Sequence, residues 1–93
     1  MTLNDELKLE TFKYFLECYF NASVNYDELT DQIKHFNSFE NTKYHQKLRD
    51  ELNLIEQLNN WEHVQEFVKR YGMRKMNEER LKWLIHSISE DLL

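Results

Sequence analysis

The chain has 93 residues, of which 41% are apolar and 31% charged, and 17 acidic residues against 12 basic ones give a net charge of −5. This length predicts one domain, and an aromatic share of 14% provides core material that disordered chains lack. A single cysteine excludes an internal disulfide, and no signal-peptide pattern or apolar run of about 20 residues is found, so we expect a cytoplasmic, soluble protein.

The sequence contains no proline and one glycine, Gly72. Tight turns between strands favour these two residue types, so their scarcity indicates helices joined by short polar loops. The predicted fold class is therefore all-α: a compact single domain over residues 1–93, built as a bundle of about five helices.

The first predicted helix runs from about Asn4 to Phe20. Its apolar residues recur on one side at helical spacing, and Leu7, Tyr14 and Cys18 form a narrower strip on the opposite side. A helix that is apolar on two sides is usually central in its fold. The alternative is that Tyr14 faces a partner, because aromatic residues are enriched at interfaces. The main stripe consists of Leu9, Phe12, Phe15, Leu16, Tyr19 and Phe20.

The second predicted helix begins after Asn25, with Glu28 three residues later as in a capping box. It ends in the link NSFEN, residues 37–41. Its acidic residues are expected to face solvent, opposite an apolar stripe. That stripe consists of Tyr26, Leu29, Ile33 and Phe36.

The third predicted helix has the clearest periodicity, with apolar residues at spacings of 4, 4, 3 and 3. The dipeptide Asn59-Asn60 ends it. Lys47 and Glu51, four residues apart on the polar face, are expected to pair weakly. The stripe consists of Tyr44, Leu48, Leu52, Ile55 and Leu58.

The fourth predicted helix begins with Asn60 as its N-cap and ends at Tyr71. Gly72 follows at once, which predicts a C′ residue with a positive φ, where glycine is favoured. The apolar stripe of this helix consists of Val64, Phe67, Val68 and Tyr71.

The fifth predicted helix begins near Asn77, with acidic residues in its first turn. Trp83 lies almost opposite the apolar stripe, so it either packs on a second neighbour, which we favour, or is an exposed anchor. The stripe consists of Leu81, Leu84, Ile85, Ile88 and Leu92.

A basic cluster surrounds Gly72 and consists of Lys69, Arg70, Arg74 and Lys75. The first two lie in the last turn of a predicted helix, where cations suit the helix dipole. The cluster also permits an alternative function, a small helical nucleic-acid-binding regulator. Against it, binding to phosphates needs a wider positive surface, and the helix after the cluster opens with Glu78 and Glu79.

No catalytic or metal-binding motif is found. None of the four histidines has another His or Cys at metal-ligand spacing, and each is expected at the surface or its boundary. One glycine cannot supply a phosphate-binding loop. We therefore expect a non-enzymatic protein without a cofactor or a metal. The histidines are His35, His45, His63 and His86.

The net charge is concentrated in the N-terminal third. Residues 1–31 contain seven acids and two bases, a balance of −5, whereas residues 32–93 contain ten of each. An acidic face suits a basic partner and repels nucleic acid, although solubility alone also explains it.

Four segments carry a resemblance to a known family: ECYFNAS at the end of the first helix, LRDELNLIEQL in the third, FVKRYGMR around the glycine and WLIHSI near the end. With these segments, the chain between about Phe12 and Leu92 resembles a small all-helical family of immunity proteins from bacterial contact-dependent growth inhibition systems. The resemblance implies a protein that binds and neutralises the C-terminal toxin domain delivered by a neighbouring cell. Many such toxins are nucleases, with RNases more expected here than DNases.

The resemblance and the acidic third together predict a 1:1 heterodimer with a basic toxin domain, without a membrane or a direct nucleic-acid contact. Acidic residues of the first two helices would supply charge, and two tyrosines would be aromatic anchors. These candidate toxin-binding residues are Glu10, Tyr14, Glu17, Tyr26, Asp27, Glu28 and Asp31.

Overall fold

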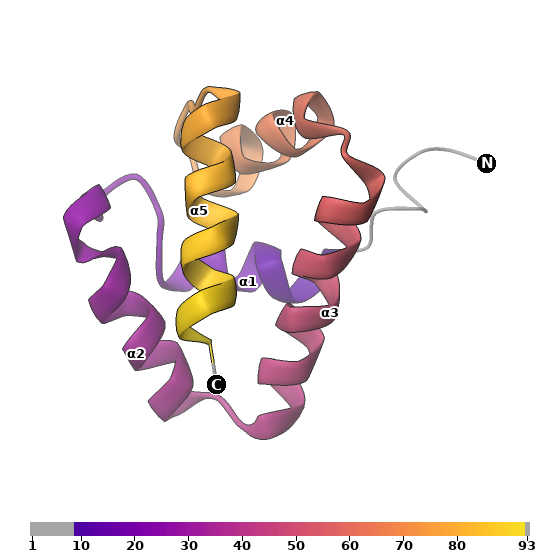
Figure 1. The fold of residues 1–93 in the computed structure, drawn as a ribbon. Helices are drawn as coiled ribbons and strands as arrows, with labels where there is room; N and C mark the ends of the chain where they lie inside the picture. The colour runs from indigo at the N-terminus through magenta and orange to yellow at the C-terminus, as the bar shows by residue number, and fades with distance from the viewer. Residues whose placement is uncertain (1–8, 93) are drawn as a thin grey trace.

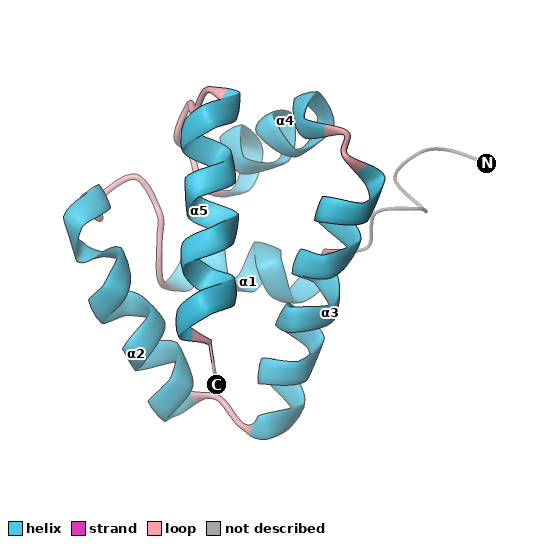
Figure 2. Cartoon of the chain, in the orientation of Figure 1, coloured by secondary structure: helices cyan, strands magenta, loops and turns pink. Residues whose placement is uncertain are grey.

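The computed structural model describes residues 9–92 as a bundle of five α-helices (Figure 1). Figure 2 shows that short loops join these helices, and residues 9–92 contain no strand. The predicted all-α bundle is thereby confirmed. The helices are α1 (Glu10–Cys18), α2 (Leu29–Phe39), α3 (Thr42–Leu58), α4 (Trp61–Tyr71) and α5 (Glu78–Asp91), and a 3₁₀ turn, η2 (Tyr26–Glu28), precedes α2.

The core lies where α5 meets the other helices. α5 stands between α2 and α3 and packs on both and on α4, while α1 crosses behind it and packs against α3 and α4 (Figure 1). Trp83 of α5 is half-buried, with its ring 5.6 Å from that of Tyr26, so the favoured packing role of Trp83 is confirmed. Four phenylalanines form the centre of the core without measurable exposure: Phe12, Phe15, Phe20 and Phe36.

The first helix is shorter than predicted. It begins at Glu10, because Leu9 has the non-helical angles φ −99° and ψ 55°, and it ends at Cys18. The end follows from a wider turn, in which the backbone N–H of Phe20 donates to the carbonyl of Phe15 at 3.1 Å. Positions 4–8 of the predicted helix, with Leu7, lie outside the described residues.

Asparagine side chains begin three of the helices, since each accepts a hydrogen bond from the backbone N–H three residues later. Asn60 and Asn77 cap α4 and α5 as predicted. Asn41 does the same for α3. Before η2, the carboxylate of Glu28 accepts from the backbone N–H of Asn25 at 2.8 Å, which is the acidic half of the predicted capping box.

The beginning of α1 is capped from a distant part of the chain. The two carboxylate oxygens of Glu51, on α3, accept from the backbone N–H groups of Thr11 at 3.1 Å and Phe12 at 2.7 Å. The predicted pairing of Glu51 with Lys47 is therefore wrong. Burial raises the pKa of Glu51 above its ordinary value, and the two backbone hydrogen bonds oppose this shift. Glu51 thus joins α3 to the start of α1.

Gly72 follows α4 as predicted, but the predicted positive φ is wrong. Gly72 has φ −92°, and the next residue, Met73, takes the left-handed conformation with φ 55°. The glycine is required for space instead. A Cβ atom at this position would lie 2.9 Å from the carbonyl oxygen of Val68 and 3.4 Å from Cδ2 of Leu16. The last turn of α4 therefore leaves no room for a side chain at this position, because the carbonyl oxygen of Val68 lies too close.

Alanine at position 72 is expected to lower the free energy of unfolding by about 1–2 kcal/mol, because the added methyl group would lie 2.9 Å from the carbonyl oxygen of Val68 in the last turn of α4. Glycine at position 73 is expected to raise it by up to about 1 kcal/mol, since it relieves the left-handed backbone. Urea denaturation of Gly72→Ala and Met73→Gly measures both. A harmless Gly72→Ala together with a destabilising Met73→Gly would contradict this assignment.

Candidate functional site

Three tyrosines and one glutamate form a cluster on the surface where α1 meets the connection between α2 and α3. The hydroxyl groups of Tyr14 and Tyr19 both donate to Oε2 of Glu40, each at 2.7 Å. The ring of Tyr44 meets that of Tyr14 edge-on, with centroids 5.9 Å apart. Tyr14 is 37% exposed and Tyr44 38%, so two aromatic rings of this tyrosine–glutamate cluster face solvent.

Three elements bring the cluster together. Tyr14 lies on α1 and Tyr19 directly after it, while Glu40 ends α2 with its backbone N–H donating to Phe36. Asn41 then caps α3 by accepting from the backbone N–H of Tyr44 at 3.0 Å, which places Tyr44 in the first turn. The cluster therefore depends on the short α2–α3 connection and on the packing of α1 against α3.

The core fixes the inner side of the cluster. Tyr19 is 9% exposed, and its ring stacks on Phe15 at 5.8 Å and meets Phe36 edge-on at 5.4 Å. Since Tyr19 is held in this way, its hydroxyl presents a fixed donor to Glu40. The buried Tyr19 consequently holds the Glu40 carboxylate in a fixed position at the surface.

The charge of the cluster comes from one carboxylate, that of Glu40, which accepts hydrogen bonds from two tyrosine hydroxyl groups. The hydrogen bond to Glu40 raises the pKa of Tyr14 to about 12. Burial, followed by the hydrogen bond to Glu40, raises the pKa of Tyr19. Both hydroxyl groups therefore keep their protons at neutral pH and donate them, and the cluster carries the negative charge of Glu40.

Exposed acidic and apolar side chains extend this surface. Glu10 and Glu17 are exposed on α1, four residues before and three residues after Tyr14, so they share its face of the helix. Cys18 is exposed as well, which corrects the expectation of an apolar strip there. At the end of α2, Phe39 is 73% exposed and directly precedes Glu40. The predicted residues Glu10, Tyr14 and Glu17 are thus found beside a larger aromatic group.

The remaining predicted contact residues lie on η2 and the first turn of α2. Asp27, Glu28 and Asp31 are exposed there. Tyr26, in contrast, is half-buried, and its ring is already covered by cations of the same chain. The guanidinium carbon of Arg80 lies 4.6 Å from its centroid and that of Arg74 5.1 Å. The ring of Tyr26 is therefore engaged inside the fold.

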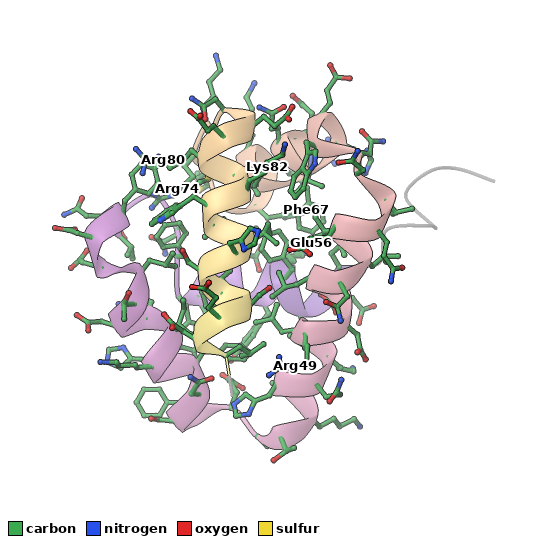
Figure 3. The ribbon with its side chains drawn as sticks, viewed as in Figure 1. Arg49, Glu56, Phe67, Arg74, Arg80 and Lys82 are labelled. Atoms are coloured by element: carbon green, nitrogen blue, oxygen red, sulfur yellow. The ribbon has the colours of Figure 1, made fainter. Side chains whose placement is uncertain are left out.

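The structure accounts for Arg74, which the sequence left unexplained. Its Nη2 donates to the backbone carbonyls of Asn21 and Val24, and its guanidinium carbon lies 4.1 Å from the ring centroid of Phe20. Figure 3 shows Arg74 and Arg80 on the side of α5 that faces the beginning of α2. Arg74 thus belongs to the architecture of the fold.

The other members of the basic cluster, Lys69, Arg70 and Lys75, are exposed. Lys69 and Arg70 lie in the last turn of α4, as predicted. With Arg74 engaged by backbone carbonyls, three of the four charges face solvent, which is a small surface for binding phosphates.

One histidine differs from the sequence-based expectation. His45 is only 9% exposed and packs against Phe36 with ring centroids 5.7 Å apart, whereas His35 and His86 are exposed and His63 is half-buried. The apolar stripe through Tyr44 and Leu48 predicted that Tyr44 lies in the core, but Tyr44 is 38% exposed and the neighbouring His45 is buried instead. No group of three or more His, Cys, Asp or Glu residues between positions 9 and 92 could hold a metal ion.

Comparisons of the chain with protein-family models, with curated proteins and with solved structures find no match. Across residues 9–92, no helix has the length and apolar character needed to cross a bilayer. The evidence on function therefore comes from the molecule itself. It is a five-helix domain that presents an acidic surface with exposed tyrosine rings.

Proposed function

We propose that this chain is an immunity protein that binds and neutralises the C-terminal toxin domain of a contact-dependent growth inhibition system in the cytoplasm. The toxin would be a basic nuclease, an RNase before a DNase, and the complex a 1:1 heterodimer. The observation that carries the proposal is the tyrosine–glutamate cluster, with its exposed rings and the flanking carboxylates Glu10 and Glu17.

The composition of this surface supports a protein partner. Tyrosine is enriched in protein interfaces and at the residues that dominate binding energy, because it buries a large rigid area and retains a polar end. Tyr14 and Tyr44 are in contact with each other and more than a third exposed. Phe39, which is 73% exposed and directly precedes Glu40, adds a large apolar side chain to the same surface.

The charge of the chain supports a basic partner. The net charge is −5, and residues 1–31 account for all of it. A nuclease binds phosphate groups and is basic for that reason, so an acidic inhibitor would occupy the same surface and exclude the substrate. Complementary charge also increases the association rate, which suits an inhibitor of a toxin that acts on entry.

Reversal of two charges beside the tyrosines is expected to slow toxin binding. A candidate toxin domain would be sought in the gene directly upstream and co-expressed with this chain, and growth and complex mass would be measured. Glu10→Lys with Glu17→Lys should slow association about tenfold or more at low salt and much less at high salt, since the attraction is screened. A second variant, Asp27→Lys with Asp31→Lys, leaves the Glu28 cap intact. It measures separately how much the acidic residues of η2 and the first turn of α2 contribute to the association rate.

Two results would contradict the proposal. The first is a wild-type chain that neither restores growth nor forms a complex with the upstream-encoded domain. The second is a pair of charge-reversed variants that protect cells and associate as fast as wild type at low salt, which would exclude an acidic binding face.

A further inference from the structure

We infer that the tyrosine–glutamate cluster is an acceptor site for one arginine side chain of a protein partner. The inference rests on the proposed function in one respect, that the partner is a basic protein. It names the group of that partner which the surface binds and the three residues that bind it: Glu40, Tyr14 and Tyr44.

Two acceptor atoms at the junction of Tyr14 and Glu40 have no donor among residues 9–92. A tyrosine hydroxyl has one proton and an ionised carboxylate has none. Tyr14 and Tyr19 both direct their protons to Oε2 of Glu40. Oε1 of Glu40 has no hydrogen bond within the described part of the chain, and the exposed oxygen of Tyr14 retains only lone pairs. This arrangement fits a ligand that donates hydrogen bonds in place of water, and the charge of Glu40 favours a cation.

No cation among residues 9–92 fills this role. The single ion pair among residues 9–92 joins Lys82 to Glu78, at 3.0 Å. Lys13, on α1 near Tyr14, has its ammonium nitrogen 4.7 Å from the ring of Tyr71 instead. Glu40 is thus a half-buried carboxylate whose only partners within residues 9–92 are neutral hydroxyl groups.

The tyrosines of the described chain divide into two groups. The rings of Tyr26 and Tyr71 each have a cation of the same molecule over them. Within residues 9–92, the rings of Tyr14, Tyr19 and Tyr44 have none. Those without a cation are the ones that surround Glu40. The cluster therefore combines free aromatic rings with a free carboxylate oxygen, a pair of features that together bind a guanidinium group.

Arginine fits this site better than lysine. A guanidinium group is planar and presents several donors in a fixed fork, so it can bond Oε1 of Glu40 and the oxygen of Tyr14 while it lies against a ring. Arg74 uses the same combination within this fold, with carbonyl oxygens as acceptors and Phe20 and Tyr26 as rings. The fixed carboxylate also lowers the entropy lost on binding.

The occupant belongs to a different protein and not to a second copy of this chain. A second copy would bring another net charge of −5 against Glu10, Glu17 and Glu40. Like charges across an interface oppose association, whereas a basic partner gains from the same carboxylates.

The test uses the full chain and two blocked peptides, tri-arginine and tri-lysine, in NMR titrations at low salt. We expect the arginine peptide to bind about threefold or more tighter and to shift the signals of Tyr14, Glu40 and Tyr44, because only guanidinium combines stacking with bidentate donation. Glu40→Gln should weaken arginine binding about fivefold, since a charge-assisted hydrogen bond is lost.

Two further variants separate the site from general charge attraction. Glu56→Gln removes one exposed carboxylate from α3 away from the tyrosine–glutamate cluster, and it should change affinity less than about twofold. Tyr44→Leu keeps Glu40 and removes a ring, and it should abolish the preference for arginine over lysine. Tyr44 is 38% exposed, so this variant retains the fold.

Each outcome decides whether the cluster is an acceptor site for a partner arginine. Equal binding of both peptides, or equal losses in Glu40→Gln and Glu56→Gln, overturns the inference even if the chain neutralises a toxin. Specific arginine binding without neutralisation leaves the acceptor site in place and removes the proposed function. Self-association that Glu40→Gln abolishes, measured by light scattering, would replace the partner arginine with a second copy.

Discussion

Replacement of Arg74 by alanine is expected to lower the free energy of unfolding by about 3 kcal/mol, as measured by urea denaturation. The change removes charge-assisted hydrogen bonds to the carbonyls of Asn21 and Val24, which are then left partly buried without a donor. It also removes the cation over the rings of Phe20 and Tyr26. Because Arg74 joins the α4–α5 loop to the α1–η2 loop, both loops should lose protection from hydrogen exchange.

The adjacent residue provides the matched control. Lys75 has the same charge and is exposed, so Lys75→Ala should change stability by less than about 0.5 kcal/mol. Arg74→Lys keeps the charge but not the planar fork, and it should recover only a small part of the loss. If Arg74→Lys were as stable as wild type, charge alone would account for this position and the hydrogen-bonded geometry would not matter.

The sequence predicted the helices well because their signals are local. Apolar residues recur at helical spacing, and asparagines stand where α4 and α5 begin, so the structure follows the pattern at Asn60 and Asn77. The error at the start of α1 arises from an interaction with a distant part of the chain. Glu51 satisfies the first N–H groups of that helix from 40 residues away, and no local pattern in the sequence carries that information.

The candidate site was predictable only in part. Tyr14, Glu10 and Glu17 could be found from charge and helical spacing. Glu40 lies in a link between helices, where it has no periodic pattern, and Tyr44 continues the apolar stripe of α3 in the sequence. These two residues join Tyr14 only because α1 packs against α3 and the α2–α3 connection is short. The capping asparagine at position 41 was a usable signal, since it fixes where α3 begins.

Glycine and arginine around position 72 show how one pattern can have several physical causes. A glycine after a helix usually provides a positive φ, yet here Met73 has it, and Gly72 instead leaves room for the carbonyl oxygen of Val68. The basic residues nearby could indicate nucleic-acid binding, yet Arg74 holds two backbone carbonyls of the same chain. Composition shows that such a segment is unusual, and only the packed structure shows what each of its residues does.

Replacement of Glu51 by alanine is expected to lower the free energy of unfolding by about 2–3 kcal/mol. The backbone N–H groups of Thr11 and Phe12 would lose their acceptor in a partly buried place, and the N-terminus of α1 would lose a favourable negative charge. Urea denaturation followed by circular dichroism measures the loss. Glu56→Ala is the control on the same helix, because Glu56 is exposed, and it should change stability by less than about 0.5 kcal/mol.

Glutamine at position 51 separates the hydrogen bonds from the charge. It retains one acceptor oxygen, so Glu51→Gln should cost less than Glu51→Ala. Burial raises the pKa of Glu51 in the folded state above the ordinary 4.5. Folding therefore takes up a proton near that pH, and the resulting stabilisation is full below about 4.5 and is lost as the pH rises through the raised pKa. The wild type should accordingly lose part of its advantage in stability over Glu51→Gln as the pH rises through the raised pKa. If that advantage grows with pH instead, the backbone hydrogen bonds stabilise the charged carboxylate more than its burial destabilises it.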